Sequence, residues 1–113
     1  MVLAGGELNG KRILSEKATK QLTAIHSGDT KTGFTPGNGW GIGWCVVQEP
    51  QGPTQHLGNG SAGHGGAFGT QGWMDPTKNM AFILMIQRSG LANGDASQMR
   101  QDLQRIAAES IKK

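Results

Sequence analysis

The stretch GHGGAFGTQGWMDPTKNMAFILMI, residues 63–86, decides the fold of this 113-residue chain. Its last part, Met80–Ile86, is the longest continuous apolar run in the sequence and has the length of one strand. Asp75–Asn79 before it is a turn sequence, and His64–Met74 is a strand candidate despite its glycines. We therefore predict an antiparallel hairpin whose second strand is central in its sheet and buried on both faces.

Upstream of the hairpin, the sequence predicts one helix and one further strand. Residues 15–26 carry apolar side chains at helical spacing, with Ser15 as the N-cap and Gly28 as the stop. The polar, glycine-containing stretch over 29–39 predicts a loop. Trp40–Val47 then alternates as a strand does, and its glycines would allow close packing on both sides.

A second helix is predicted at the other end of the chain, over Ser97–Ile111. Met99, Leu103 and Ile106 follow helical spacing there, which indicates that they form its core face. The order helix, three strands, helix predicts an α+β fold, with an antiparallel sheet of about three strands flanked by N- and C-terminal helices. At this length, residues 1–113 form a single domain.

Composition narrows the class of protein. The chain has 19 glycines in 113 residues, more than twice the average share of about 7%, which predicts a loop-rich fold with a thin core. Its net charge of +3 comes from basic residues spread along the chain, whereas nucleic-acid binding needs a clustered basic face, so no such partner is expected. We find no candidate membrane helix or signal peptide and expect a soluble chain.

Cofactor and metal motifs are weak. Gly58–Gly63 matches G-x-G-x-x-G, but the dinucleotide fingerprint requires a preceding strand and a following helix, which this context lacks. Cys45, His56 and His64 are the soft or borderline metal ligands, and their spacing is not that of a zinc site. We expect no cofactor and no metal, and a lone Cys45 that is buried and inert.

The glycine-rich segment 63–70 allows two interpretations. A strand this poor in side chains lets a substrate carbonyl or backbone approach closely, and His64 at its head offers a cation or hydrogen-bond donor. Alternatively, the same glycines serve only tight packing against a neighbouring helix. The residues alone do not decide between these interpretations.

Three segments in this order resemble a known family: LAGGELNGKRILS (3–15), GWGIGW (39–44) and GHGGAFGT (63–70), with Trp73 and Asp75-Pro76 downstream. Together they are similar to the C-terminal portion of the serine β-lactamase and penicillin-binding-protein-like hydrolases, particularly class C-type β-lactamases and related esterases. The resemblance runs from about Leu3 to Lys113. It implies a partial β-lactamase-like fold whose N-terminal strands and mainly helical region are missing.

The resemblance also implies a site. In that family K-T-G, or H-x-G in many esterase-like members, lies on an edge strand beside the nucleophile, and His64-Gly65-Gly66 falls on this motif. His64 would act as cation or donor toward the substrate, and the backbone N–H of Ala67 would be one of two oxyanion-hole donors. Gly65 lacks the threonine hydroxyl of K-T-G, so an esterase or peptidase-like parent is favoured over a β-lactamase.

The family's nucleophile has no convincing counterpart. These enzymes use S-x-x-K, in which the lysine one turn later helps to deprotonate the serine, and a second Y-x-N or S-x-N element. The chain has no tyrosine, and its one S-x-x-K match is Ser110 with Lys113 at the end of the last predicted helix. A lysine in a last turn is explained by the helix dipole. No complete catalytic set is predicted.

Three hypotheses for function follow. The leading one is a C-terminal fragment of a serine hydrolase (esterase, peptidase or β-lactamase), inactive alone; the others are a half-site made active by a complementing chain, and a non-enzymatic module that binds a peptide or acyl group. A truncated sheet would expose an edge and apolar surface. The expected partner is therefore a second copy, in a homodimer, or the missing N-terminal catalytic portion. The resemblance also implies a parent family that is often exported.

Overall fold

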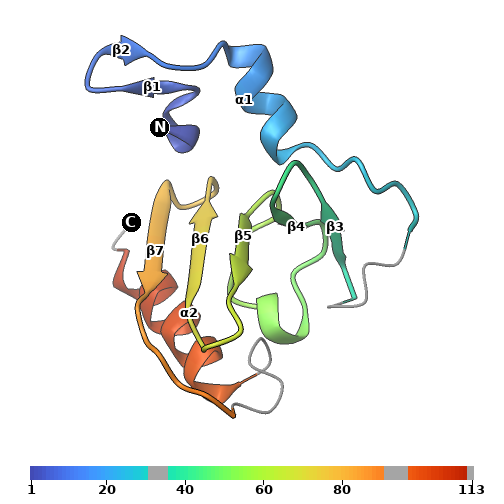
Figure 1. Ribbon diagram of the computed structural model, residues 1–113, viewed down its shortest axis with the longest axis vertical. Coiled ribbons are helices and arrows are strands. Elements are labelled where there is room, and N and C mark those ends of the chain that lie inside the picture. The colour runs from blue at the N-terminus through green and yellow to red at the C-terminus, as the bar shows by residue number, and fades with distance from the viewer. Residues whose placement is uncertain (31–35, 91–96, 112–113) are drawn as a thin grey trace.

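The structure is a computed structural model that describes residues 1–30, 36–90 and 97–111. Within these ranges the chain forms one large antiparallel sheet, a small hairpin and two α-helices (Figure 1). The elements are, in order, the 3₁₀ turn η1 (Val2–Ala4), β1 (Glu7–Leu8), β2 (Lys11–Arg12), α1 (Glu16–Thr23), β3 (Asn38–Trp40), β4 (Cys45–Val47), the 3₁₀ turn η2 (Gly52–Thr54), β5 (Ala62–Gly65), β6 (Gln71–Asp75), β7 (Met80–Leu84) and α2 (Gln98–Ser110).

The large sheet is a meander with the order β3-β4-β5-β6-β7, so each strand pairs with its neighbour in sequence. The β6–β7 hairpin has the most extensive register, from Gln71 opposite Leu84 to Asp75 opposite Met80. The turn at 75–79 and the antiparallel hairpin are therefore confirmed. The α+β class is confirmed as well, with a two-stranded hairpin, β1–β2, that we did not predict.

The described residues contain five strands in this sheet where the sequence predicted about three. The prediction was wrong because two expected strands each fold into a hairpin. Trp40–Val47 turns at 41–44, where Gly43 has φ 77° and a Cβ on Gly41 would lie 2.6 Å from the Leu22 carbonyl oxygen. His64–Met74 turns after Gly65 in the same way. Alternating glycines therefore mark turns here.

The last strand, β7, is also not where it was predicted. It lies at an edge of the sheet and pairs with β6. Ile83 of β7 is 70% accessible, and Met85, which directly follows the strand, is 81% accessible. Met80 is buried and Phe82 partly buried on the opposite side. An apolar run fixes strand length and pairing but does not fix a strand's position in the sheet.

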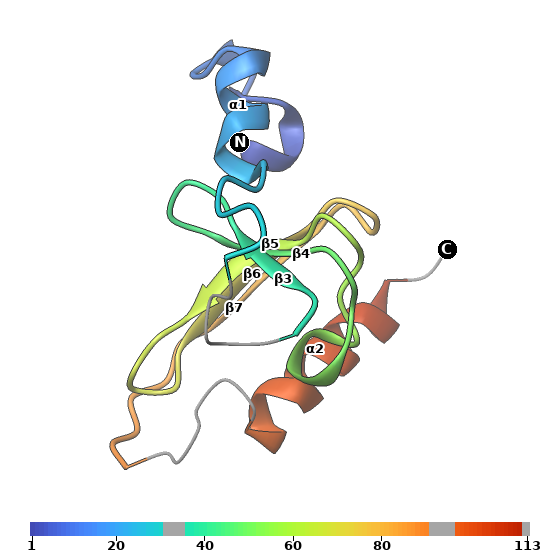
Figure 2. The same cartoon turned by 90° about the vertical axis from the view of Figure 1, so that its right-hand side faces the viewer.

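The two helices occupy different places. The prediction of the first is confirmed at its start, where Ser15 Oγ accepts a 3.1 Å hydrogen bond from the Ala18 N–H. This helix, α1, ends at Thr23 because the next turn leaves it: the His26 N–H donates to the Trp40 carbonyl of β3. Figure 2 shows α1 beyond one end of the sheet, while α2 and η2 lie against one face.

The core lies between the sheet and the layer formed by α2 and η2. Its buried apolar residues are Cys45, Val47, Leu57 and Trp73, with Trp40 and Phe82 packed around them. The inner face of α2 was predicted to be apolar, but its most buried residues are Arg100 and Gln104, each 2% accessible, while Ile106 is 54% accessible. The helix therefore meets the sheet largely through polar side chains. Among the described residues, no helix has the length and apolarity needed to cross a membrane.

Candidate functional site

The four residues implied by the resemblance lie together along β5 and the turn that follows it. His64 and Gly65 are the last residues of β5, and Gly66 and Ala67 begin the turn to β6. The resemblance implied an edge strand, which was wrong for the described sheet, because β4 and β6 pair with β5 on its two sides. His64, Gly65 and Gly66 are partly buried and Ala67 is exposed. The chain therefore presents this segment at the end of the central strand.

His64 is held on two sides. Its ring lies 5.1 Å from the Trp40 ring, centroid to centroid, at an interplanar angle of 48°. Its Nδ1 makes a short hydrogen bond with the Gly65 carbonyl oxygen. In the neutral ring this bond places the proton on Nδ1, since a carbonyl oxygen only accepts.

The turn after β5 has the closed form of a hairpin. The Gly66 N–H donates to the Thr70 carbonyl at 2.8 Å, and the Gly69 N–H donates to the Gly66 carbonyl at 3.1 Å. A Cβ on Gly66 would lie 2.2 Å from Thr70 Oγ1. A side chain on Gly66 would therefore displace the Thr70 hydroxyl within the turn. This contact is not with a helix, so it does not decide between the two interpretations of the glycine-rich segment.

The backbone N–H of Ala67 has no protein acceptor among the described residues. It sits in an exposed turn, whereas the N–H groups of Gly66 and Gly69 on either side are bonded within the turn. A backbone donor is satisfied by water or by a ligand when no protein group accepts from it.

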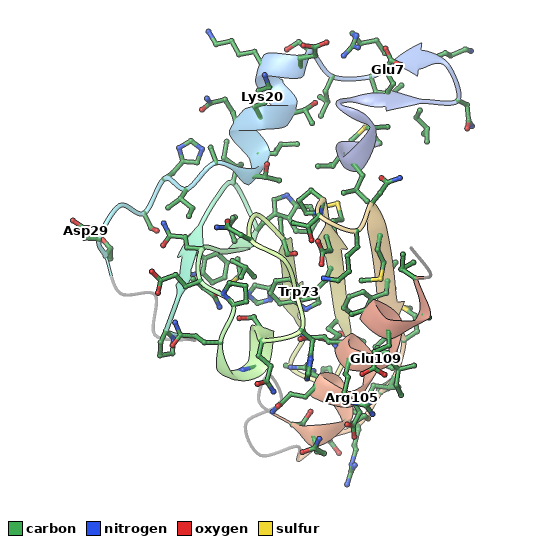
Figure 3. The ribbon with its side chains drawn as sticks, turned by 180° about the vertical axis from the view of Figure 1, so that it is seen from behind. Glu7, Lys20, Asp29, Trp73, Arg105 and Glu109 are labelled. Atoms are coloured by element: carbon green, nitrogen blue, oxygen red, sulfur yellow. The ribbon has the colours of Figure 1, made fainter. Side chains whose placement is uncertain are left out.

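The turn also contacts α2, which the sequence reasoning missed. Arg100 of α2 donates to main-chain oxygens of residues 66–70, at 2.6 to 3.1 Å. Gln71 Nε2 donates in return to the Arg100 carbonyl at 3.1 Å, and Gln71 Oε1 accepts from Trp73 Nε1 at 3.0 Å and from Gln104 Nε2 at 3.2 Å. Figure 3 views the sheet from this side and places Trp73 near its centre. The spacing i, i+4 of Arg100 and Gln104 beside the apolar positions was the available signal.

A cavity of about 30 Å³ lies near Trp40, Cys45 and His64 on the core side. It has room for one or two water molecules. A larger ligand would therefore have to approach the segment from its outer side, where Ala67 and Phe68 are exposed.

The serines do not form the missing catalytic set. Ser61 is completely buried just before β5. The Ser110 hydroxyl donates to the Ala107 carbonyl at 2.8 Å at the end of α2, and its S-x-x-K partner Lys113 lies outside the described residues.

The G-x-G-x-x-G match does not form a phosphate loop. The Gly58 N–H donates to Asp75 Oδ2 at 2.9 Å, and the segment leads into strand β5 and not into a helix. Burial alone would raise the pKa of Asp75, but hydrogen bonds from Thr77, Lys78 and the Gly58 N–H, together with the Lys78 charge, outweigh it and lower that pKa below its ordinary value. Within the described part of the chain, no three His, Cys, Asp or Glu side chains gather into a metal site.

Comparison with known proteins identifies the family. A family description, Beta-lactamase, matches residues 1–106, and the chain therefore belongs to the beta-lactamase family. Among solved structures it is similar to "EstCE1, a hydrolase with promiscuous acyltransferase activity", with a TM-score of 0.65 and 22% identity. No curated protein matches.

The match to EstCE1 covers 95% of this chain and 26% of that one, so the chain spans about a quarter of the hydrolase's length. The resemblance drawn from the three segments is thus confirmed for the family. At this identity the structural likeness supports the partial β-lactamase-like fold alone.

Proposed function

We propose that this chain forms one wall of the active site of a serine hydrolase, with the Ala67 N–H as an oxyanion donor and with His64 in the cation or donor role that the resemblance implies. The observation that carries this proposal is the Ala67 N–H, which has no protein acceptor among the described residues and lies in an exposed turn directly after the H-G-G segment. A preformed donor of this kind stabilises the negative charge that develops on a carbonyl oxygen during acyl transfer.

The nucleophile comes from another segment, either of a longer protein or of a partner chain. The sequence has no tyrosine, and its serines lack the S-x-x-K context except at Ser110. The chain alone is therefore inactive. Incubation with a fluorophosphonate or a fluorescent penicillin, followed by intact-mass measurement, gives no covalent adduct, and a stoichiometric adduct would contradict this assignment.

The favoured reaction is ester hydrolysis. Gly65 occupies the position at which K-T-G members carry a threonine hydroxyl, so a contact to the substrate carboxylate is missing here. A p-nitrophenyl ester is accordingly a better test substrate than a β-lactam.

The open edge of β7 is the proposed contact surface for a second copy of the chain. Among the described residues β7 has one strand neighbour, and Ile83 and Met85 next to its free edge are exposed. Unpaired edges with apolar side chains pair readily with another strand. In the isolated chain a homodimer would cover this surface.

The test of the active-site proposal is a chimera in which this chain replaces the matching quarter of EstCE1, which supplies the rest of the fold. Ala67 is the second residue of the turn closed by the Gly69 N–H and the Gly66 carbonyl, a position that proline tolerates. Ala67→Pro therefore removes the donor without opening the turn, while Ala67→Ser keeps the donor.

In the chimera, Ala67→Pro lowers the kcat for p-nitrophenyl acetate by about 10²–10³, the usual effect of losing one oxyanion donor. Ala67→Ser leaves kcat within about threefold of the parent chimera. Equal kcat values for the parent chimera and Ala67→Pro, or a folded chimera without turnover, would overturn the proposal.

A further inference from the structure

We infer that Arg100 is a positioning residue that fixes the direction of the Ala67 N–H through the peptide unit that Ala67 shares with Gly66. The catalytic part of this inference rests on the proposed function, while the structural part can be tested on the chain alone.

The first observation is the convergence of Arg100 on a single turn. Its Nη2 donates to the Gly66 carbonyl at 2.6 Å and to the Thr70 carbonyl at 2.8 Å, and its Nε donates to the Gly69 carbonyl at 3.1 Å. Arg100 is 2% accessible and lies 30 to 34 residues away in sequence from these acceptors. A buried guanidinium needs such acceptors, and its planar fork can reach several at once, which an ammonium group on a flexible stem does less well.

The second observation concerns the peptide between Gly66 and Ala67. The Gly66 carbonyl and the Ala67 N–H belong to one planar unit, and the described chain has no cis peptide bonds. In a trans unit the N–H points opposite to the C=O. Because Arg100 holds the carbonyl from the side of α2, the Ala67 N–H points away from α2.

The bond to Gly66 should also strengthen the donor. A hydrogen bond from a charged group to a carbonyl polarises the peptide unit and makes its N–H a better donor. Arg100 would thus both orient and activate the Ala67 N–H without contacting a substrate.

The turn depends on contacts from outside it to keep one conformation, because it is flanked by glycines. Gly66 and Gly69 bracket it, and Gly69 has φ 94°, a conformation that glycine adopts readily but does not hold by itself. Gln71 Nε2 donates a hydrogen bond to the Arg100 carbonyl in return, so hydrogen bonds join the turn, α2 and β6.

The first arm of the test uses the isolated chain with Arg100→Gln and Arg100→Lys. The matched control is Arg105→Gln, because Arg105 lies on the same helix but is exposed and pairs with Glu109 at 3.0 Å. Figure 3 labels Arg105 and its partner Glu109 on α2. The readouts are amide hydrogen exchange of Gly66 and Gly69 and the ¹⁵N chemical shift of Ala67, which responds to hydrogen bonding at the preceding carbonyl.

Both Arg100 variants are expected to raise exchange at Gly66 and Gly69 by about tenfold or more, the loss typical of a hydrogen bond to a charged group. They also shift the Ala67 ¹⁵N resonance, while amides of the β6–β7 hairpin keep their exchange rates. Arg105→Gln changes none of these. If Gly66 and Gly69 keep their wild-type exchange rates in a folded Arg100→Lys chain, Arg100 does not hold the turn and the inference is wrong.

The second arm uses the EstCE1 chimera and p-nitrophenyl acetate. Arg100→Lys is expected to lower kcat by about tenfold with KM within about twofold, because the donor acts on developing charge and not on ground-state binding. A normal kcat with a loosened turn would overturn the positioning role alone, whereas a normal kcat in Ala67→Pro would overturn the proposed function.

Discussion

In most proteins apolar side chains are buried and polar ones are exposed, but two regions of this molecule show the opposite: the face of the sheet covered by α2 and the edge formed by β7. The covered face buries Arg100 and Gln104 at 2% accessibility each, while the open edge leaves Ile83 at 70% and Met85 at 81%. Polar groups can be buried when partners satisfy them, and an apolar strand stays exposed when nothing covers it. Residue type alone therefore does not locate the core of this domain.

Removing the largest side chain of the covered face should have the largest effect. Trp73 is 8% accessible, packs against Cys45, Val47 and Leu57, and donates its indole N–H to Gln71. Trp73→Ala should cost about 3–5 kcal/mol of unfolding free energy, enough to unfold a marginally stable domain. Urea denaturation followed by circular dichroism measures this, and a loss below about 1 kcal/mol would mean that the covered face is not the core.

A smaller loss is expected at the end of β6, where Asp75 is buried and bonded to Thr77, Lys78 and the Gly58 N–H. Asp75→Asn should cost about 1–3 kcal/mol by leaving these groups poorly paired. Because the folded-state pKa is lowered, the stabilisation from ionised Asp75 is fully present above its unfolded pKa of about 3.9 and is lost as pH falls below it.

The pH dependence separates this effect from general acid unfolding. The free energy of unfolding of the wild type falls more steeply below about pH 4 than that of Asp75→Asn. Equal slopes for the wild type and Asp75→Asn would contradict the lowered pKa.

The open edge predicts an effect of concentration. If a second copy covers β7, each tenfold increase in chain concentration adds about 1.4 kcal/mol of stability per dimer and raises the melting temperature. Met85→Lys, which places a charge beside the edge, should abolish this dependence and give a monomer in sedimentation. A wild-type monomer of 11.9 kDa with a concentration-independent melt would remove the dimer from consideration.

The smallest effect is expected on the exposed side of β7. In the monomeric Met85→Lys background, Ile83→Ala should change the free energy of unfolding by no more than about 0.5 kcal/mol, the usual range for an exposed site. A loss of about 2 kcal/mol or more there would show that this side chain is buried after all.

Local signals in the sequence predicted local structure well. Asp75–Asn79 indicated the turn and Ser15 the start of α1, because turn and cap preferences depend on neighbouring residues. The place of β7 was predicted wrongly because the apolar run was taken as a sign of burial on both faces, whereas β7 is the last strand of the described meander and lies at its edge.

The site shows the same division. The segment His64 to Ala67 was singled out by a motif, but its contacts with Arg100 were hidden because the acceptors are 30 to 34 residues away and are main-chain atoms. A charged residue in an amphipathic helix is ordinarily taken as solvent-facing. A bond to a main-chain carbonyl does not require a particular amino acid at the accepting residue, so the sequence of the turn carries no sign of it.

The contacts made by Arg100 have a consequence for how this protein could change over time. The arginine binds carbonyl oxygens, which every amino acid carries, so it imposes no chemical identity on residues 67 and 68 at the tip of the turn. Phe68 is already 55% accessible there. Under the proposed function, the side chains at the tip can therefore vary, and substrate preference with them, while the geometry of the Ala67 N–H stays constant.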